Sequence, residues 1–168
     1  MNGLFSQRAK IAFLASAALN MLVILVGHYL LPSRTALHFN AHGLADRWGS
    51  RVEFIAINLL MVIVTYYAIE YGAKLVLKFP KKLISLPNKD FWLSPEQRPM
   101  TEQKLTDSLR CFGVLNFLFQ TILLGLVIAA HHMKPVQLNT PGMIVCTVGF
   151  FIATGIWCVW MYRSFKCK

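Results

Sequence analysis

Residues 32–51 form a polar segment, PSRTALHFNAHGLADRWGSR, between two long apolar runs. Its side chains include imidazole, amide, carboxylate and guanidinium groups, the types that bind metal ions or charged ligands. The candidate residues among those that carry these groups are His38, Asn40, His42, Asp46 and Arg47. This segment is therefore where a binding site is expected.

One hypothesis is a zinc or copper site, because neutral imidazoles and carboxylates ligate both metals. The candidate ligands are His38, His42, Asp46, His131 and His132. The chain has no HExxH motif or comparable ligand spacing. Histidine also suits a membrane surface because its ring has an apolar body and a polar tip. A structural role for these histidines is the alternative.

The second hypothesis is recognition of a ligand or a protein partner. Its candidate residues are His38, Asn40, Gly43, Asp46, Arg47 and Trp48. Asp46 and Arg47 could instead pair with Arg51 and Glu53, an exposed contact worth only ~0–1 kcal/mol. No activated serine or cysteine can be named, so a non-enzymatic binding protein is favoured over an enzyme built on the histidines.

The elements that hold this segment are four apolar runs. The chain is 56% hydrophobic and 14% charged, which is too apolar for an ordinary soluble domain. Each run approaches the ~20 residues that a helix needs to cross a bilayer. The expected spans are 11–31, 54–77, 111–130 and 143–162, joined in part by loops 32–53 and 78–110. The prediction is an all-α, polytopic membrane protein in which residues 1–168 form one domain.

The distribution of lysine and arginine predicts the orientation. Of the 17 basic residues, only Arg34, Arg47, Arg51 and Lys134 lie in the first and third loops. The others flank the termini and loop 78–110, so these parts should be cytoplasmic and the polar segment should face outside. The net charge of +10 is then explained by topology and anionic lipid, without nucleic acid.

The cytoplasmic loop offers a second candidate surface. Asn88, Lys89, Asp90 and Trp92 could dock a soluble partner. The alternative is lipid contact, because tryptophan favours the membrane interface.

Two pairs of polar residues fall within the apolar runs. Asn116 and Gln120 share one helix face and should hydrogen-bond within the bundle. Glu70 and Lys74 are four residues apart, a favourable order for an ion pair on one helix.

Two motifs resemble a bacterial membrane-protein family of unknown function. The first runs from Leu31-Pro32 through His38-Phe39-Asn40 and Gly43 to Asp46-Arg47-Trp48-Gly49-Ser50, with Ala36 where the family often has proline. The second is Pro87–Leu93, PNKDFWL. The family is similar to the immunity and signalling membrane protein of the sporulation-delay toxin system. The resemblance implies a multi-pass protein of the bacterial cytoplasmic membrane.

The expected function is therefore a non-enzymatic envelope protein whose outer loop recognises a ligand, peptide or protein partner, in immunity or signalling. One alternative is a metal-dependent membrane site or enzyme built on the outer histidines. Another is a small accessory subunit of a membrane complex, for which an oligomer is an option. The sequence has no internal repeat or broken helix of the kind that transporters use.

Overall fold

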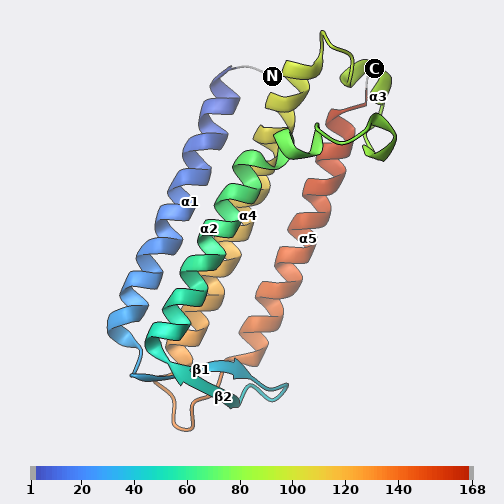
Figure 1. Cartoon of the computed structure of the whole chain (residues 1–168). Coiled ribbons are helices and arrows are strands. Elements are labelled where there is room, and N and C mark those ends of the chain that lie inside the picture. Colours follow the sequence, from blue (N-terminus) through green and yellow to red (C-terminus); the bar gives the residue numbers. More distant parts are fainter. Residues whose placement is uncertain (1–2, 167–168) are drawn as a thin grey trace.

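The computed structural model describes residues 3–166, and four long helices dominate it (Figure 1). They are α1 (Gly3–Leu30), α2 (Arg51–Val76), α4 (Arg98–Ala130) and α5 (Thr140–Ser164). Each contains an apolar stretch long enough to cross a membrane. The prediction of a mainly helical, multi-pass membrane protein is confirmed.

The helices extend beyond the spans expected from hydropathy. α1 begins at Gly3 rather than residue 11, and α4 begins at Arg98 rather than residue 111. The polar residues in these extensions are compatible with helix, and Pro99 stands in the first turn, where its missing N–H is not needed. Hydropathy therefore located the apolar part of each helix and not its ends.

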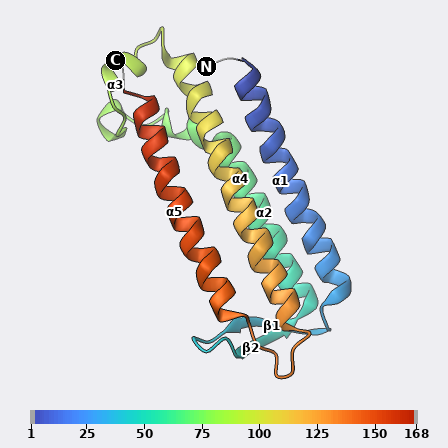
Figure 2. The ribbon, with the colours of Figure 1, turned by 180° about the vertical axis from the view of Figure 1, so that it is seen from behind.

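α4 is the central helix, and it packs against α1, α2 and α5 (Figure 2). The core lies between α1, α2 and α4, where the rings of Phe13 and Phe117 are fully buried with centroids 5.5 Å apart. A Cβ atom on Gly113 would lie 2.5 Å from the ring of Phe13, so only glycine permits this approach. By contrast, α5 has no buried residue along its length.

Polar side chains also join the helices. The Gln120 amide donates to Asn116 Oδ1 at 2.6 Å, as the spacing predicts, and to Thr65 Oγ1 of α2 at 3.2 Å. On the side of α4 that faces α1, the Asn20 amide of α1 donates to Thr121 Oγ1 at 2.9 Å.

The pairing expected between Glu70 and Lys74 is wrong. Glu70 instead accepts two hydrogen bonds from Arg110 of α4, each 2.8 Å long, while Lys74 lies 4.0 Å from Glu102. The guanidinium group matches a carboxylate with two parallel N–H groups, which a lysine ammonium cannot do. This contact between helices therefore replaces the weaker contact along one helix.

At one end of the bundle, the polar segment folds into a β-hairpin, which we call the hairpin end (Figure 1). Strand β1 (Arg34–Phe39) pairs antiparallel with β2 (Ala45–Ser50), with an irregularity in register around His38. Ser50 then caps α2 by accepting a hydrogen bond from the Glu53 N–H at 3.0 Å. The segment expected as a loop is thus a small ordered sheet.

The opposite end, which we call the terminal end, holds the starts of α1 and α4 and the end of α5 (Figure 1). The chain that connects α2 to α4 contains a short 3-10 helix, η1 (Lys81–Leu83), and the short helix α3 (Lys89–Trp92). The Trp92 indole is buried, donates to the Phe165 carbonyl at 2.8 Å and packs on the Phe165 ring. Trp92 therefore fastens this connection to the end of α5.

Candidate functional site

The turn of the β-hairpin is built by an asparagine and a glycine. Asn40 Oδ1 accepts hydrogen bonds from the backbone N–H groups of His42 at 2.9 Å and Leu44 at 3.0 Å. Gly43 has a φ of +77°, in the left-handed region that glycine adopts without steric cost. The side chain of Asn40 is therefore used to shape the turn.

The connection between α4 and α5 holds this turn in place. The Leu138 N–H donates to the Gly43 carbonyl at 2.7 Å, and Leu44 forms a β-bridge with Gln137. The Gln137 amide also donates to the His42 carbonyl at 3.4 Å. The tip of the hairpin is thereby tied to the start of α5.

His131 fastens the body of the hairpin to the end of α4. Its Nε2 accepts a hydrogen bond from the Ala36 N–H at 2.9 Å, so the ring proton lies on Nδ1, which donates to the Val127 carbonyl at 2.8 Å. The ring also meets those of Phe39 and Trp48 edge-on. Both nitrogens are occupied by backbone groups, which leaves His131 no free lone pair for a metal ion.

We expect replacement of His131 by alanine to lower the free energy of unfolding by about 1–3 kcal/mol, because the buried Ala36 N–H loses its acceptor. Amide hydrogen exchange across β1 should accelerate, while exchange in the core of α1 should not. The neighbouring exposed residue provides the control, and His132→Ala should leave both quantities unchanged. Equal effects of the two substitutions would contradict the anchoring role.

A second group of side chains remains exposed on the hairpin. His38 Nδ1 lies 2.6 Å from Asp46 Oδ1, with 65% and 43% of the two side chains exposed. Asp46 therefore pairs with His38 and not with Arg51, whose guanidinium donates to the Leu31 carbonyl at 3.1 Å. The exposed Arg47 follows Asp46 directly on β2.

Trp48 is the partly exposed aromatic residue of this surface. The guanidinium of Arg34 lies 5.3 Å from the centre of its ring, within the range of a cation–π contact. The ring of His131 packs edge-on against the same indole, so Trp48 also links β2 to the end of α4.

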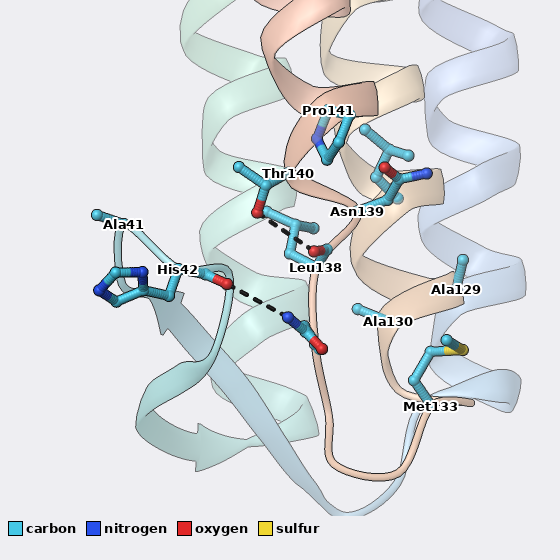
Figure 3. A pocket seen from close by; sticks show the side chains of 11 residues that line it. Ala41, His42, Ala129, Ala130, Met133, Leu138, Asn139, Thr140 and Pro141 are labelled. Atoms are coloured by element: carbon cyan, nitrogen blue, oxygen red, sulfur yellow. Dashed lines mark hydrogen bonds between the residues drawn. The ribbon is translucent and has the colours of Figure 1, made fainter.

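A cavity of about 710 Å³ lies beside the hairpin turn (Figure 3). Its walls come from the turn, the end of α4, the α4–α5 connection and the start of α5. They include His42, Ala129, Met133, Leu138 and Thr140. The lining is mainly apolar with a few polar groups at its rim, as in many ligand pockets.

The metal candidates do not form a single cluster. Within residues 3–166, no group of three or more histidine, cysteine or acidic side chains is close enough to hold a metal ion. His38 and Asp46 are adjacent, His42 borders the cavity, His131 is held by backbone groups and His132 is exposed.

The candidate residues of the second surface lie at the terminal end, away from the hairpin (Figure 1). Asn88 adopts a left-handed conformation, Asp90 pairs with Lys81 at 2.6 Å, and Trp92 is buried. The hydrogen bond from Lys81 holds the pKa of the Asp90 carboxyl below its usual value. Asn88, Lys89 and Asp90 can therefore meet a partner at this end, whereas Trp92 serves the packing of α5.

Sequence reasoning missed two parts of the site. Leu138 and Gln137 contact the hairpin, and α4, α5 and the connection between them together form most of the cavity wall. The paired histidines after an apolar run marked the place, but no spacing rule identifies which of them reaches a strand about 95 residues earlier in the chain.

The fold and the site together define a multi-pass membrane protein whose four helices carry a folded β-hairpin at one end. Residues 15–66 match a domain of unknown function, DUF1648. The matched region covers most of α1, the whole hairpin and the first part of α2. No curated protein and no solved structure matches the chain.

Proposed function

We propose that this chain is a non-enzymatic protein of the bacterial cytoplasmic membrane, and that its hairpin end recognises a peptide or protein ligand outside the cell. The observation that carries this proposal is the combination of a fixed hairpin, an exposed polar surface and an adjacent apolar cavity. Recognition sites commonly join a rigid scaffold to a few exposed polar groups.

The chemistry of this end favours an amphipathic peptide. His38, Asp46 and Arg47 offer both signs of charge on the hairpin, while the cavity beside His42 offers an apolar surface. A peptide with charged groups next to apolar side chains could use both. Immunity against a membrane-active toxin peptide, or signalling in response to one, is the most concrete form of this function.

The proposed orientation has support from the arrangement of the basic residues. The starts of α1 and α4, the end of α5 and the connection that holds α3 lie at the terminal end (Figures 1 and 2). Most of the lysine and arginine residues fall in these segments and in the last turn of α2. Basic residues are retained on the cytoplasmic side during insertion, so the hairpin end would face outward.

A survival assay tests the proposal. Bacteria that produce the wild-type chain should survive a toxic peptide of the sporulation-delay type, and Arg47→Ala or Asp46→Asn should abolish survival at equal membrane levels. Lys82→Ala, an exposed position at the terminal end outside both candidate surfaces, is the control and should protect fully. Failure of the wild-type chain to protect would refute immunity, whereas full protection by both hairpin variants would refute recognition by this surface.

A metal site is the alternative, and the adjacent His38 and Asp46 side chains are the observation that favours it. Such a site would bind zinc or copper and would need a further ligand from the target. Elemental analysis of protein purified without chelator, together with His38→Ala, distinguishes the two proposals. Stoichiometric metal that the substitution removes would favour the metal site, and its absence from both proteins would refute it.

A further inference from the structure

A buried carboxylate at the terminal end lacks a full set of partners. The side chain of Asp107 is 0% exposed, and its Oδ1 accepts hydrogen bonds from Ser6 Oγ at 2.9 Å and from Arg110 Nη1 at 3.3 Å. Its second oxygen, Oδ2, is also buried and has no hydrogen-bond partner within residues 3–166. Burial of an ionised group without its hydrogen bonds is costly, so this oxygen points to a missing donor.

The available positive charge is largely taken by another group. Arg110 directs two 2.8 Å hydrogen bonds to Glu70 and only one longer bond to Asp107. Ser6 donates a hydrogen bond but carries no charge. The negative charge of Asp107 is therefore only partly compensated.

Asp107 borders a polar cavity of about 350 Å³ between α1, α2 and α4. The charged groups on its wall are three carboxylates, Glu70, Glu102 and Asp107, and two cations, Lys74 and Arg110. The wall therefore carries more negative than positive charge. Lys74, one of the two cations, has 60% of its side chain exposed. A water molecule occupies ~30 Å³ in the liquid, so the cavity is large enough for a group bigger than a single bare ion.

The cavity lies at the level of the lipid headgroups. α4 has 33 residues, which is about 50 Å of helix, whereas the hydrocarbon core is ~30 Å thick. When its apolar part, residues 111–130, fills the hydrocarbon, Asp107 and Arg110 stand just beyond it. The cavity is therefore at the height of the headgroups of the adjoining leaflet.

We propose that this cavity binds a cationic group at Asp107 Oδ2, and that the group is a primary ammonium of a lipid headgroup or an inorganic monovalent cation. A primary ammonium donates hydrogen bonds to a carboxylate, and carboxylate oxygens coordinate a metal cation. In a zwitterionic headgroup, the neighbouring phosphate can meet Lys74. A quaternary ammonium has no N–H group and cannot satisfy Oδ2. The proposal does not depend on the function of the hairpin end.

The experiment compares two lipids that differ only at the ammonium. Wild-type protein in mild detergent is mixed with equal amounts of phosphatidylethanolamine and phosphatidylcholine of the same acyl chains, and retained lipid is measured by native mass spectrometry. A second arm measures thermal unfolding without lipid, in sodium, potassium or tetramethylammonium chloride, the last of which has no N–H group. A lipid ligand should give about a tenfold preference for phosphatidylethanolamine. An inorganic ligand should instead raise the melting temperature in sodium or potassium only.

Asp107→Asn should abolish whichever effect the wild-type protein shows. Asp46→Asn, the same change at the hairpin end, is the matched control and should preserve it. Glu102→Gln is a second variant, to be used if Asp107→Asn does not fold. Glu102 lines the same cavity and is partly exposed, so its replacement should not prevent folding. It should weaken the effect several-fold. Equal retention of both lipids together with no cation dependence would overturn the proposal, as would an effect that persists in Asp107→Asn or is unchanged in Glu102→Gln.

Discussion

Replacing Arg110 by leucine is expected to lower the free energy of unfolding by about 3 kcal/mol or more. The substitution leaves Glu70 and Asp107 as carboxylates without their shared partner between α2 and α4, where the Asp107 side chain is fully buried. Removing one partner of a buried ion pair typically costs ~3–5 kcal/mol, because the remaining charge stays buried without an opposite charge. Reversible unfolding in mixed detergent measures this loss.

Two further variants separate the charge effect from a general loss of packing. Arg8→Leu removes an exposed positive charge near the same end of α1 and should change stability little. The double variant Glu70→Gln with Arg110→Leu should recover part of the loss, because one of the abandoned charges is removed. If Arg110→Leu costs no more than Arg8→Leu, the ion-pair network does not stabilise the bundle.

Replacing Gly43 by alanine is expected to detach the hairpin from the start of α5. Gly43 has a φ of +77°, and a Cβ atom there would lie 2.5 Å from Thr140 Oγ1 and 2.8 Å from the Leu138 carbonyl oxygen. A strained backbone of this kind costs of order 1–3 kcal/mol, and the backbone oxygen cannot move aside as a side chain can. Hydrogen exchange at Leu138 and within β2 should accelerate strongly.

A matched substitution is available within the helices. Among the described residues, no atom lies within 4 Å of a Cβ atom on Gly149 or Gly125, apart from chain neighbours and the helix backbone. Gly149→Ala should therefore keep the hairpin intact and stabilise its helix by about 0.5–1 kcal/mol. Unchanged hydrogen exchange in the Gly43→Ala protein would show that the turn is not held by α5. The same variant links structure to function, because detachment should also weaken the proposed recognition of a peptide.

Part of the fold could be derived from the pattern of apolar residues. Runs of about 20 such residues have one stable form in hydrocarbon, the helix, because every backbone polar group must be paired within the segment. The hydrogen bond between Asn116 and Gln120 followed for a similar reason, since residues four apart on a helix are neighbours. The ends of the helices could not be predicted in the same way, because the extensions of α1 and α4 lie outside the apolar stretches.

The candidate site was found in the sequence only as a collection of residue types. The grouping of His38 and Asp46 on paired strands requires the register of β1 and β2, which is irregular at that position. His131 anchors the hairpin and His132 is exposed, because only the His131 imidazole reaches the Ala36 N–H from the end of α4. Adjacent residues of the same type therefore acquired different roles from their positions in space.

The sequence by itself determined that this protein crosses a membrane with four helices and carries a polar segment between the first two, because these features depend on local composition and helix length. Only the tertiary structure decided that the segment is a hairpin held by α4 and α5, that Glu70 pairs with Arg110, and that one Asp107 oxygen has no hydrogen-bond partner among residues 3–166. These contacts join residues about 40 to 100 positions apart. Helix packing selects such contacts, and no local pattern in the chain specifies them.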